Sequence, residues 1–164
     1  MDRRGFLKLA AGGASLLVWP LSWLPTTARA ADSITRITHS DAEWKRLLSP
    51  QQYQVLRHAA TEAPFSSPLD HEIRHGVYAC AGCGLALFPS RFKYDSGTGW
   101  PSFFDVLPGH ILTQADHSML ETRTEYHCAR CGGHQGHVFD DGPAPSGLRY
   151  CNNGVALKLL LEEG

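Results

Sequence analysis

Two short cysteine pairs constrain the fold of this chain more than any other feature of its sequence. Cys80 and Cys83 form one Cys-x-x-Cys motif, Cys128 and Cys131 form a second, and glycine follows each. A turn with two intervening residues lets two thiolates point at one ion, and a following glycine permits the positive φ that such a turn often uses. Two such turns complete a tetrahedron and leave no open position. The sequence therefore predicts one structural zinc ion per chain, bound by these four cysteines, that supports folding and does not catalyse.

Two alternatives use the same residues differently. Two disulfides would suit an oxidising compartment, but a disulfide within a Cys-x-x-Cys motif is strained and usually redox-active. A second metal arrangement would use Cys128, Cys131, His134 and His137, which are spaced three residues apart. It leaves the first cysteine pair without a role, whereas a four-thiolate site explains both pairs.

The first thirty residues form a predicted export signal. Arg3-Arg4 precedes a moderately apolar stretch that ends at Pro20, and residues 28–30 have the small-x-small pattern of a cleavage site. The apolar stretch is too short and too interrupted for the roughly 20 residues of a membrane-spanning helix. We expect residues 1–30 to be a twin-arginine signal peptide and residues 31–164 to be one exported, periplasmic domain with no membrane span after cleavage. The alternative is a disordered or uncleaved tail.

The charge balance narrows the range of partners. The chain has 15 Lys and Arg against 16 Asp and Glu, a net charge of −1, and is 43% hydrophobic. Nucleic-acid-binding proteins usually carry a basic stripe, which this composition lacks. We therefore expect an ordinary globular domain that does not bind nucleic acid.

Two short helices are predicted at the start of the mature chain. Ser40 and Glu43 form the pattern of a capping box, which predicts a helix from about Asp41 to Leu48. Ser49-Pro50 is typical of a helix start and predicts a second helix that ends near His58. After Ala63 the pattern changes to loops and short β-type runs, which predicts a small, mainly β domain. These runs are Val77–Ala79, Ala86–Phe88, His137–Phe139 and Val155–Leu159.

The fifth cysteine, Cys151, is left without a partner once the metal takes four thiols. It could be a small buried core residue. Its neighbours favour a reactive thiol: Arg149 can lower the pKa of the thiol, and His134 and His137 precede it in the chain. Pairing of cysteine with histidine activates a nucleophile. We therefore expect Cys151 to be a nucleophile.

Four further segments, together with the cysteine pairs, closely resemble the B-type methionine sulfoxide reductases, which reduce the R epimer of methionine sulfoxide. They are TEAPFS at 61–66, SGTGWPSF at 96–103, GHVFDDGP at 136–143 and GLRYCNN at 147–153. The resemblance runs from about Asp41 to Leu161. It implies a mainly β fold of the β-tent type, in which two small antiparallel sheets follow short N-terminal helices and a four-cysteine zinc site clamps them.

The resemblance also implies roles for individual residues. Cys151 corresponds to the catalytic cysteine, and Trp100 to the aromatic residue that receives the methyl group of the substrate. His134, His137 and Asn153 match polar positions of the active site. Attack of a thiolate on the sulfoxide sulfur needs a donor that relieves charge on the oxygen, and imidazoles suit this at neutral pH. The reaction leaves a sulfenic acid on the cysteine and releases methionine. The implied substrates are oxidised proteins or peptides that contain methionine-R-sulfoxide.

The chain departs from many relatives at the residue two positions before the active-site tryptophan. Relatives often have a second cysteine there that resolves the sulfenic acid, and this chain has Thr98. We therefore expect an external thiol or a thioredoxin-like protein to regenerate Cys151. Asn152, Gly154 and Gln135 also stand where relatives often have an aliphatic residue, serine and leucine, respectively.

Three smaller expectations complete the analysis of the sequence. Asp140 and Asp141, which precede Gly142-Pro143, are predicted to be turn formers and not acids. Two alternative functions remain at this stage. One is a zinc-stabilised interaction module without enzymatic activity, because fold alone does not define function. The other is a thiol peroxidase that uses a single activated cysteine.

Overall fold

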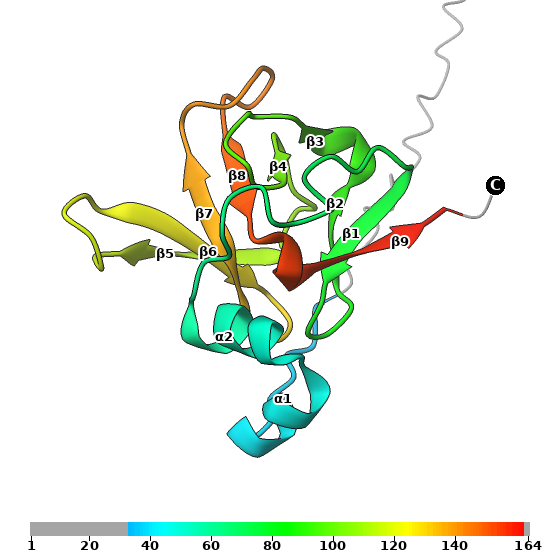
Figure 1. Ribbon diagram of the computed structural model, residues 1–164, viewed down its shortest axis with the longest axis vertical. Coiled ribbons are helices and arrows are strands. Elements are labelled where there is room, and N and C mark those ends of the chain that lie inside the picture. Colours follow the sequence, from blue (N-terminus) through cyan, green and yellow to red (C-terminus); the bar gives the residue numbers. More distant parts are fainter. Residues whose placement is uncertain (1–32, 163–164) are drawn as a thin grey trace, which may run out of the picture. The chain divides into compact units, whose positions relative to one another are not determined.

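Two antiparallel sheets and two short helices make up residues 33–162, the part of the chain that the structure, a computed structural model, describes (Figure 1). The helices are α1 (Asp41–Leu47) and α2 (Pro50–His58). The smaller sheet has the order β2-β1-β9 and consists of β1 (Gly76–Cys80), β2 (Ala86–Pro89) and β9 (Leu157–Leu161). The larger sheet has the order β3-β4-β8-β7-β6-β5 and consists of β3 (Lys93–Tyr94), β4 (Ser102–Phe103), β5 (Ile111–Asp116), β6 (Arg123–Cys128), β7 (His134–Phe139) and β8 (Arg149–Asn152). The predicted mainly β fold with short N-terminal helices is confirmed.

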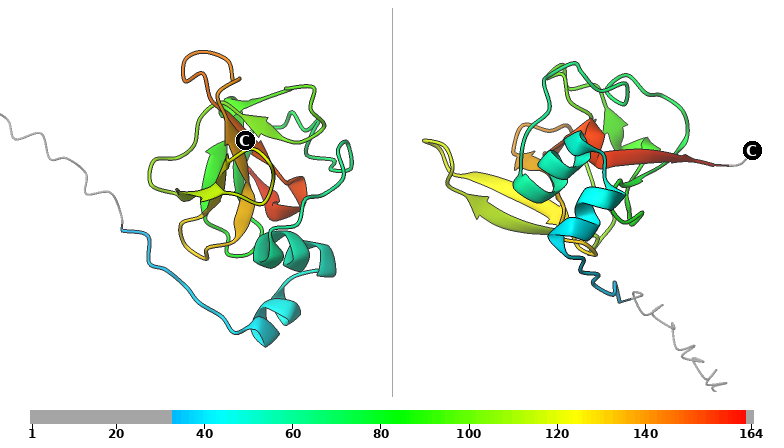
Figure 2. Two further views of the ribbon diagram at one scale, coloured as in Figure 1. Left: turned by 90° about the vertical axis from the view of Figure 1, so that its left-hand side faces the viewer. Right: turned by 60° about the horizontal axis from the view of Figure 1, so that its bottom comes forward.

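Both helices begin with a capping box. The Ser40 hydroxyl accepts a hydrogen bond from the Glu43 N–H, and the Glu43 carboxylate accepts one from the Ser40 N–H at 2.7 Å. The helix expected from Asp41 to Leu48 is confirmed to within one residue. Helix α2 starts at the predicted proline and ends at His58. Both helices lie at the end of the domain where β7 begins (Figure 2).

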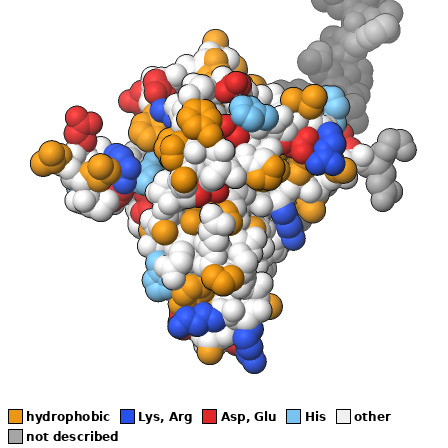
Figure 3. Space-filling view, viewed as in Figure 1, with side chains coloured by type: hydrophobic (Ala, Val, Ile, Leu, Met, Phe, Trp, Pro, Cys, Tyr) orange, Lys and Arg blue, Asp and Glu red, His pale blue; other side chains and the backbone are white. Residues whose placement is uncertain are grey.

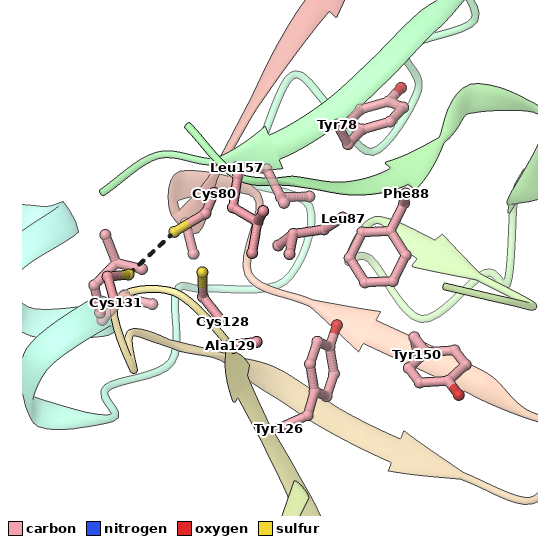
Figure 4. Packing of buried hydrophobic residues seen from close by; sticks show 14 of the residues in the cluster. Tyr78, Cys80, Leu87, Phe88, Tyr126, Cys128, Ala129, Cys131, Tyr150 and Leu157 are labelled. Atoms are coloured by element: carbon pink, nitrogen blue, oxygen red, sulfur yellow. Dashed lines mark hydrogen bonds between the residues drawn. The ribbon is translucent and has the colours of Figure 1, made fainter. Parts of the chain in front are cut away.

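An aromatic cluster joins the two sheets. Tyr78 and Phe88 come from the smaller sheet, and Phe103, Tyr126 and Tyr150 come from the larger one; each is at most 9% exposed. Figure 4 labels all of these rings except Phe103. The rings of Phe88 and Phe103 stack with centroids 4.2 Å apart. Burying a ring of this size stabilises a fold by roughly 1.5–3 kcal/mol. The cluster therefore fixes strands β4 and β8 from the inner face of the sheet.

The two faces of the larger sheet differ in character because successive side chains along a strand point in opposite directions. In β8, Tyr150 and Asn152 are buried toward the core, where the Asn152 amide donates to the Tyr126 hydroxyl at 2.9 Å. Arg149 and Cys151 alternate with them and so belong to the outer face. Cys151 is paired in register with Ser102 on β4 and with a residue of β7. The predicted nucleophile thus lies in the middle of a six-stranded sheet.

The β5–β6 hairpin projects from the body of the domain (Figure 1). Its strands pair up to Asp116 and Arg123, and the turn beyond them exposes Met119 and Leu120. Hydrophobic side chains are visible on this projection in Figure 3. Asp116 and Arg123 end the paired part of the hairpin. The hairpin thereby places them on the outer face of the sheet, beside His137 of β7.

The strand expected at Val155–Leu159 is shifted toward the C-terminus. Residues Gly154–Ala156 form a 3₁₀ turn, and β9 begins only at Leu157. The reason is that the Glu62 carboxylate, which is buried, accepts the N–H groups of Gly154 and Val155 at 2.5 and 2.9 Å. These two amides are therefore not available for a sheet ladder.

The predicted export signal at residues 1–30 lies outside the described residues. Within residues 33–162, no helix is both long and apolar enough to cross a membrane.

Candidate active site and metal centre

The four paired cysteines gather at one point, and Figure 4 labels three of them, Cys80, Cys128 and Cys131, where the two sheets approach each other. Their sulfur atoms all lie within 4.8 Å of one another, with Cys80 and Cys131 3.6 Å apart and Cys83 and Cys128 3.5 Å apart. A tetrahedral zinc ion with Zn–S bonds of about 2.3 Å would separate its sulfurs by about 3.8 Å. The four side chains therefore fit a metal ion, and the predicted metal-binding cluster is confirmed.

Each cysteine pair sits in the same kind of turn. The Gly84 N–H donates to the Cys80 carbonyl at 2.8 Å, and the Gly132 N–H donates to the Cys128 carbonyl at 2.8 Å. Both glycines have a positive φ, +75° and +68°, which other residues rarely adopt. The glycines after each motif thus have the conformational role predicted from the sequence.

Neither alternative arrangement of the thiols agrees with the structure. The closest sulfur pairs, 3.5 and 3.6 Å apart, are much longer than a disulfide bond of about 2.05 Å. His134 and His137 do not approach the sulfurs as ligands, because their ring nitrogens face the carboxylates of Glu125 and Asp116.

Cys151 opens into a small pocket of about 130 Å³ on the outer face of the larger sheet. The pocket combines one tryptophan, one histidine and several amides, and its lining residues are Thr61, Trp100, Arg123, Gly136, His137, Phe139, Cys151, Asn152 and Asn153. A larger hollow of about 540 Å³ lies against α1 and α2, but it contains none of the predicted catalytic residues. The chemistry therefore belongs to the smaller pocket.

Burial raises the pKa of the Cys151 thiol above its ordinary value. The charge of Arg149 and hydrogen bonds from Thr98 and Arg149 act in the opposite direction but do not cancel it. The predicted influence of Arg149 is thus confirmed in sign, whereas a net depression of the thiol pKa is not found. The cause is that desolvation of a thiolate inside a sheet costs more than one neighbouring cation returns.

Asp141 holds Arg149 in place. Its carboxylate accepts two hydrogen bonds from the guanidinium, both at 2.7 Å, and the guanidinium also lies over the Phe139 ring, 4.4 Å from its centroid. The sequence predicted Asp141 as a turn former and not an acid, and did not predict this ion pair with Arg149. The position of Asp141 after β7 places it beside the first residue of β8, which local sequence does not reveal.

A register irregularity brings the two histidines to the same face of the sheet. His137 pairs with Glu125, but the pairing then shifts from Tyr126–Gly136 to His127–His134, so that Gln135 is an extra residue in β7. In a regular strand, residues three apart point to opposite faces, and a β-bulge removes this alternation. The His134 and His137 rings lie 5.6 Å apart, between centroids.

Each histidine is oriented by a carboxylate from the β5–β6 hairpin. His134 Nδ1 lies 2.5 Å from Glu125 Oε1, and His137 Nε2 lies 2.8 Å from Asp116 Oδ2. Burial lowers the pKa of His134, and the negative charge of Glu125 offsets part of this effect. Four hydrogen bonds, two from Ser118 and one each from His137 and Arg123, hold the pKa of Asp116 far below its ordinary value.

Trp100 and Asn153 are positioned by one segment. Trp100 Nε1 donates to the Glu62 carbonyl at 3.1 Å, and the Asn153 side-chain oxygen accepts the Glu62 N–H at 3.0 Å. The Asn153 amide nitrogen lies 3.1 Å from the Gln135 carbonyl and 3.5 Å from His134 Nε2. Four of the five predicted site residues, Cys151, Trp100, His137 and Asn153, line the pocket. The fifth, His134, does not line it and is buried beside His137 and Asn153.

Glycine is required beside the nucleophile. A Cβ at Gly136 would lie 1.9 Å from the Cys151 carbonyl oxygen, and a Cβ at Gly154 would lie 1.9 Å from the Ser67 hydroxyl. The serine common at position 154 in relatives would therefore not fit here without movement of the neighbouring loop.

Sequence reasoning missed four acidic residues of the site: Glu62, Asp116, Glu125 and Asp141. The site groups that they hold are 8 to 93 residues away in the chain: Gly154 and Val155 for Glu62, His137 for Asp116, His134 for Glu125 and Arg149 for Asp141. The only available signal was the alternating pattern of residues 123–128, which predicts a strand with Glu125 on the polar face.

Comparison with known proteins shows the family to which this chain belongs. Residues 48–160 match the SelR domain family. A protein of Bradyrhizobium diazoefficiens named peptide methionine sulfoxide reductase MsrB is 51% identical over 133 residues, which cover 80% of this chain and 96% of that protein. Proteins of the same name from Methanosarcina barkeri and Leptospira interrogans are 51% and 49% identical and cover 77% of this chain each, and 90% and 97% of their own length. Among solved structures, the crystal structure of the Mis18 'Yippee-like' domain is similar over 56% of this chain and 100% of that one, with a TM-score of 0.43 and 16% identity.

Proposed function

Because this chain belongs to the SelR-domain family of B-type methionine sulfoxide reductases and reduces methionine-R-sulfoxide, we propose that Cys151 is the nucleophile of the reaction. The observation that carries the proposal is the convergence of Cys151, Trp100 and His137 on one pocket. The reductase activity of the family argues against both the interaction module and the thiol peroxidase.

The reaction follows from the groups in this pocket. The Cys151 sulfur attacks the sulfoxide sulfur while a proton is delivered to the sulfoxide oxygen. The oxygen is then transferred to Cys151, so that one thiol and one sulfoxide give one sulfenic acid and one methionine. His134 and His137 supply and orient the proton, since each is held by a carboxylate. Because burial raises the pKa of the Cys151 thiol, the thiolate is a smaller fraction at a given pH than at an exposed cysteine.

Trp100 receives the methyl group of the substrate. Its ring is fixed by the hydrogen bond from Nε1 to the Glu62 carbonyl and forms part of the pocket wall. A contact between sulfur and an aromatic ring contributes about 0.3–1.5 kcal/mol. The Asn153 side chain contacts both Glu62, which holds Trp100, and His134. It therefore fixes the position of the tryptophan relative to the histidine.

Regeneration of Cys151 depends on an external thiol or a thioredoxin-like reductant. The sequence has five cysteines, four of which belong to the metal cluster. Thr98, the residue at the usual resolving position, has no thiol. After one turnover, mass spectrometry should find a sulfenate or an adduct of it on Cys151. A disulfide between Cys151 and a cluster cysteine would contradict this cycle.

The ion in the four-cysteine cluster is zinc. Four thiolates with tetrahedral spacing match its preferences, and a closed four-ligand site supports folding and not catalysis. We also propose that residues 1–30 direct the chain through the twin-arginine route to the periplasm and that residues 31–164 form the mature domain. Fractionation of cells that express the chain with Arg3 and Arg4 replaced by lysine tests this, because the mature form should then be lost from the periplasm.

The decisive experiment is an epimer-resolved assay with dithiothreitol as reductant. The purified mature chain should consume methionine-R-sulfoxide, free or in a peptide, and leave the S epimer. Cys151→Ser should be inactive while it retains its metal and its thermal unfolding temperature. Full activity of Cys151→Ser would refute the proposed role.

A further inference from the structure

A second group of metal-ligand side chains lies on the outer face of the larger sheet. Glu125 and His127 belong to β6 and His134 to β7, and one ligand atom of each lies within 4.8 Å of the others. The group shares no residue with the four-cysteine cluster. We propose that Glu125, His127 and His134 bind a divalent transition metal ion, such as Zn²⁺, and that this ion inhibits the reductase.

His127 is the residue that sets this group apart from an ordinary hydrogen-bond network. Its Nε2 is buried and makes no hydrogen bond, although Glu125 Oε1 lies 3.3 Å away. A buried polar atom without a partner is costly, so its presence needs a reason. A tetrahedral zinc ion with bonds of about 2.0 Å separates its ligand atoms by about 3.3 Å. This edge of the group therefore already has the spacing of a metal site.

The third ligand approaches the same carboxylate oxygen. His134 Nδ1 lies 2.5 Å from Glu125 Oε1, and an ion would replace the proton of this hydrogen bond and move the two groups apart by less than 1 Å, on the order of a normal adjustment of a ligand. The Gln114 amide donates to the other carboxylate oxygen at 2.8 Å, which keeps Oε1 directed at the histidines. Metal sites commonly hold their carboxylates in this way.

The donor set and the exposure indicate which ions enter. Two imidazoles and one carboxylate form a set that zinc and related transition metals prefer over calcium or magnesium. Such a site leaves a fourth position for water. The His127 side chain is 19% exposed, which gives an ion a path from the surface of the hairpin.

Occupation of this site would act on the reaction through His134. The ion would take the Nδ1 lone pair and replace the hydrogen bond to Glu125, so that His134 could no longer take up a second proton and deliver it as an imidazolium. This inhibitory role depends on the function proposed above for His134. The binding of the ion does not depend on it.

Binding is tested by calorimetric titration of Zn²⁺ into zinc-loaded Cys151→Ser protein, in which no free thiol competes. One further equivalent should bind. His127→Gln in the same background should weaken this binding by at least tenfold, since removal of even an outer-shell partner typically costs roughly 10- to 100-fold. His117→Gln, which changes an exposed histidine in the turn of the same hairpin, should bind as before. Absence of the further equivalent, or equal binding by His127→Gln, would overturn the proposal.

If His127→Gln does not fold, a crystal structure of the protein with His127 intact tests the site instead. Crystals grown with excess Zn²⁺ should show an anomalous scattering peak between Glu125, His127 and His134. A peak only at the four cysteines would overturn the proposal.

Inhibition is tested separately with Cys151 intact. Excess Zn²⁺ should inhibit methionine-R-sulfoxide reduction, and His127→Gln should need at least tenfold more Zn²⁺ for the same inhibition. Equal sensitivity would place the inhibition at Cys151 and reject the inhibitory role. If the chain had no reductase activity at all, the calorimetric result would still decide whether the site exists.

Discussion

The two thiol-bearing regions of the chain surround their sulfur atoms in opposite ways. In the four-cysteine cluster, each sulfur lies among other sulfurs at metal spacing, and two local turns supply all ligands. At Cys151, one sulfur lies in the centre of a sheet, beside a guanidinium and an open pocket. The metal ligands are therefore positioned by local turns, whereas the surroundings of Cys151 depend on the pairing of strands that are distant in the sequence.

The largest effect should come from breaking the cluster. Cys128→Ser removes one of four ligands, and the free energy of metal binding, on the order of 10 kcal/mol, is coupled to folding. We expect a chain that lacks its metal and does not fold cooperatively, measured by metal analysis and by circular dichroism during heating. The matched variant Cys151→Ser changes a sulfur outside the cluster and should keep both properties. A Cys128→Ser protein that melts like the wild type would mean that the cluster is not structural.

The same comparison explains which features could be predicted from the sequence. The cysteine turns and both helices depend on residues within five positions of each other, and the pattern of glycine, serine and proline predicts them. The start of strand β9 was misplaced by two residues because Glu62, more than 90 residues away, accepts the N–H groups of Gly154 and Val155, of which Val155 was the first residue of the expected strand.

The reactive thiol Cys151 was predicted from its neighbouring residues, whereas Trp100 and Asn153 were predicted only through the resemblance to a family. Spacing alone would have placed His134 and His137 on opposite faces of a strand, and the extra residue Gln135 corrects this. The carboxylates that orient them are Asp116 of β5 and Glu125 of β6. No local sequence pattern indicates that these side chains meet the histidines of β7.

A second prediction tests whether sheet pairing controls the chemistry at Cys151. Glu125→Gln should lower kcat/KM by about 10- to 100-fold, the range typical for loss of a partner that orients an imidazole. Because the Glu125 carboxylate raises the pKa of His134, its removal should lower that pKa further. The limb of the pH–rate profile that reports His134 should therefore move to lower pH. Glu121→Gln, an exposed carboxylate in the turn of the same hairpin, is the control. An unchanged pH profile in Glu125→Gln would mean that the carboxylate does not act through His134.

A third, smaller effect concerns the guanidinium beside the nucleophile. Arg149 lowers the pKa of Cys151 against the effect of burial, so Arg149→Met should raise that pKa further. The thiolate population then falls at every pH below the midpoint, and alkylation by iodoacetamide slows. The rate of alkylation measured against pH gives the midpoint directly. Arg91→Met, which changes an exposed arginine, should leave the midpoint where it is. A downward shift in Arg149→Met would show that burial by Arg149 outweighs its charge.

The smallest effect should appear where the two thiol regions meet. Gln135 is fully buried; its amide nitrogen lies 3.4 Å from the Cys80 sulfur, and its backbone carbonyl accepts the Asn153 N–H at 2.9 Å. The side-chain oxygen has no partner. The same amide nitrogen also donates to the Gly133 carbonyl at 3.5 Å. Gln135→Leu therefore removes two weak hydrogen bonds and one unpaired acceptor, and the net change in stability should stay within about 1 kcal/mol.

Metal retention should respond more than stability, because an N–H donor stabilises the thiolate form of Cys80 and outer-shell partners typically change metal affinity by roughly tenfold or more. Gln135→Leu should release its metal faster to a coloured chelator, whereas kcat/KM should change little because the backbone bond to Asn153 remains. Gln54→Leu, an exposed glutamine on α2, controls for surface effects. If Gln135→Leu kept its metal equally well but lost activity, the residue would serve the pocket and not the cluster, and the separation between the two thiol regions would have to be drawn elsewhere.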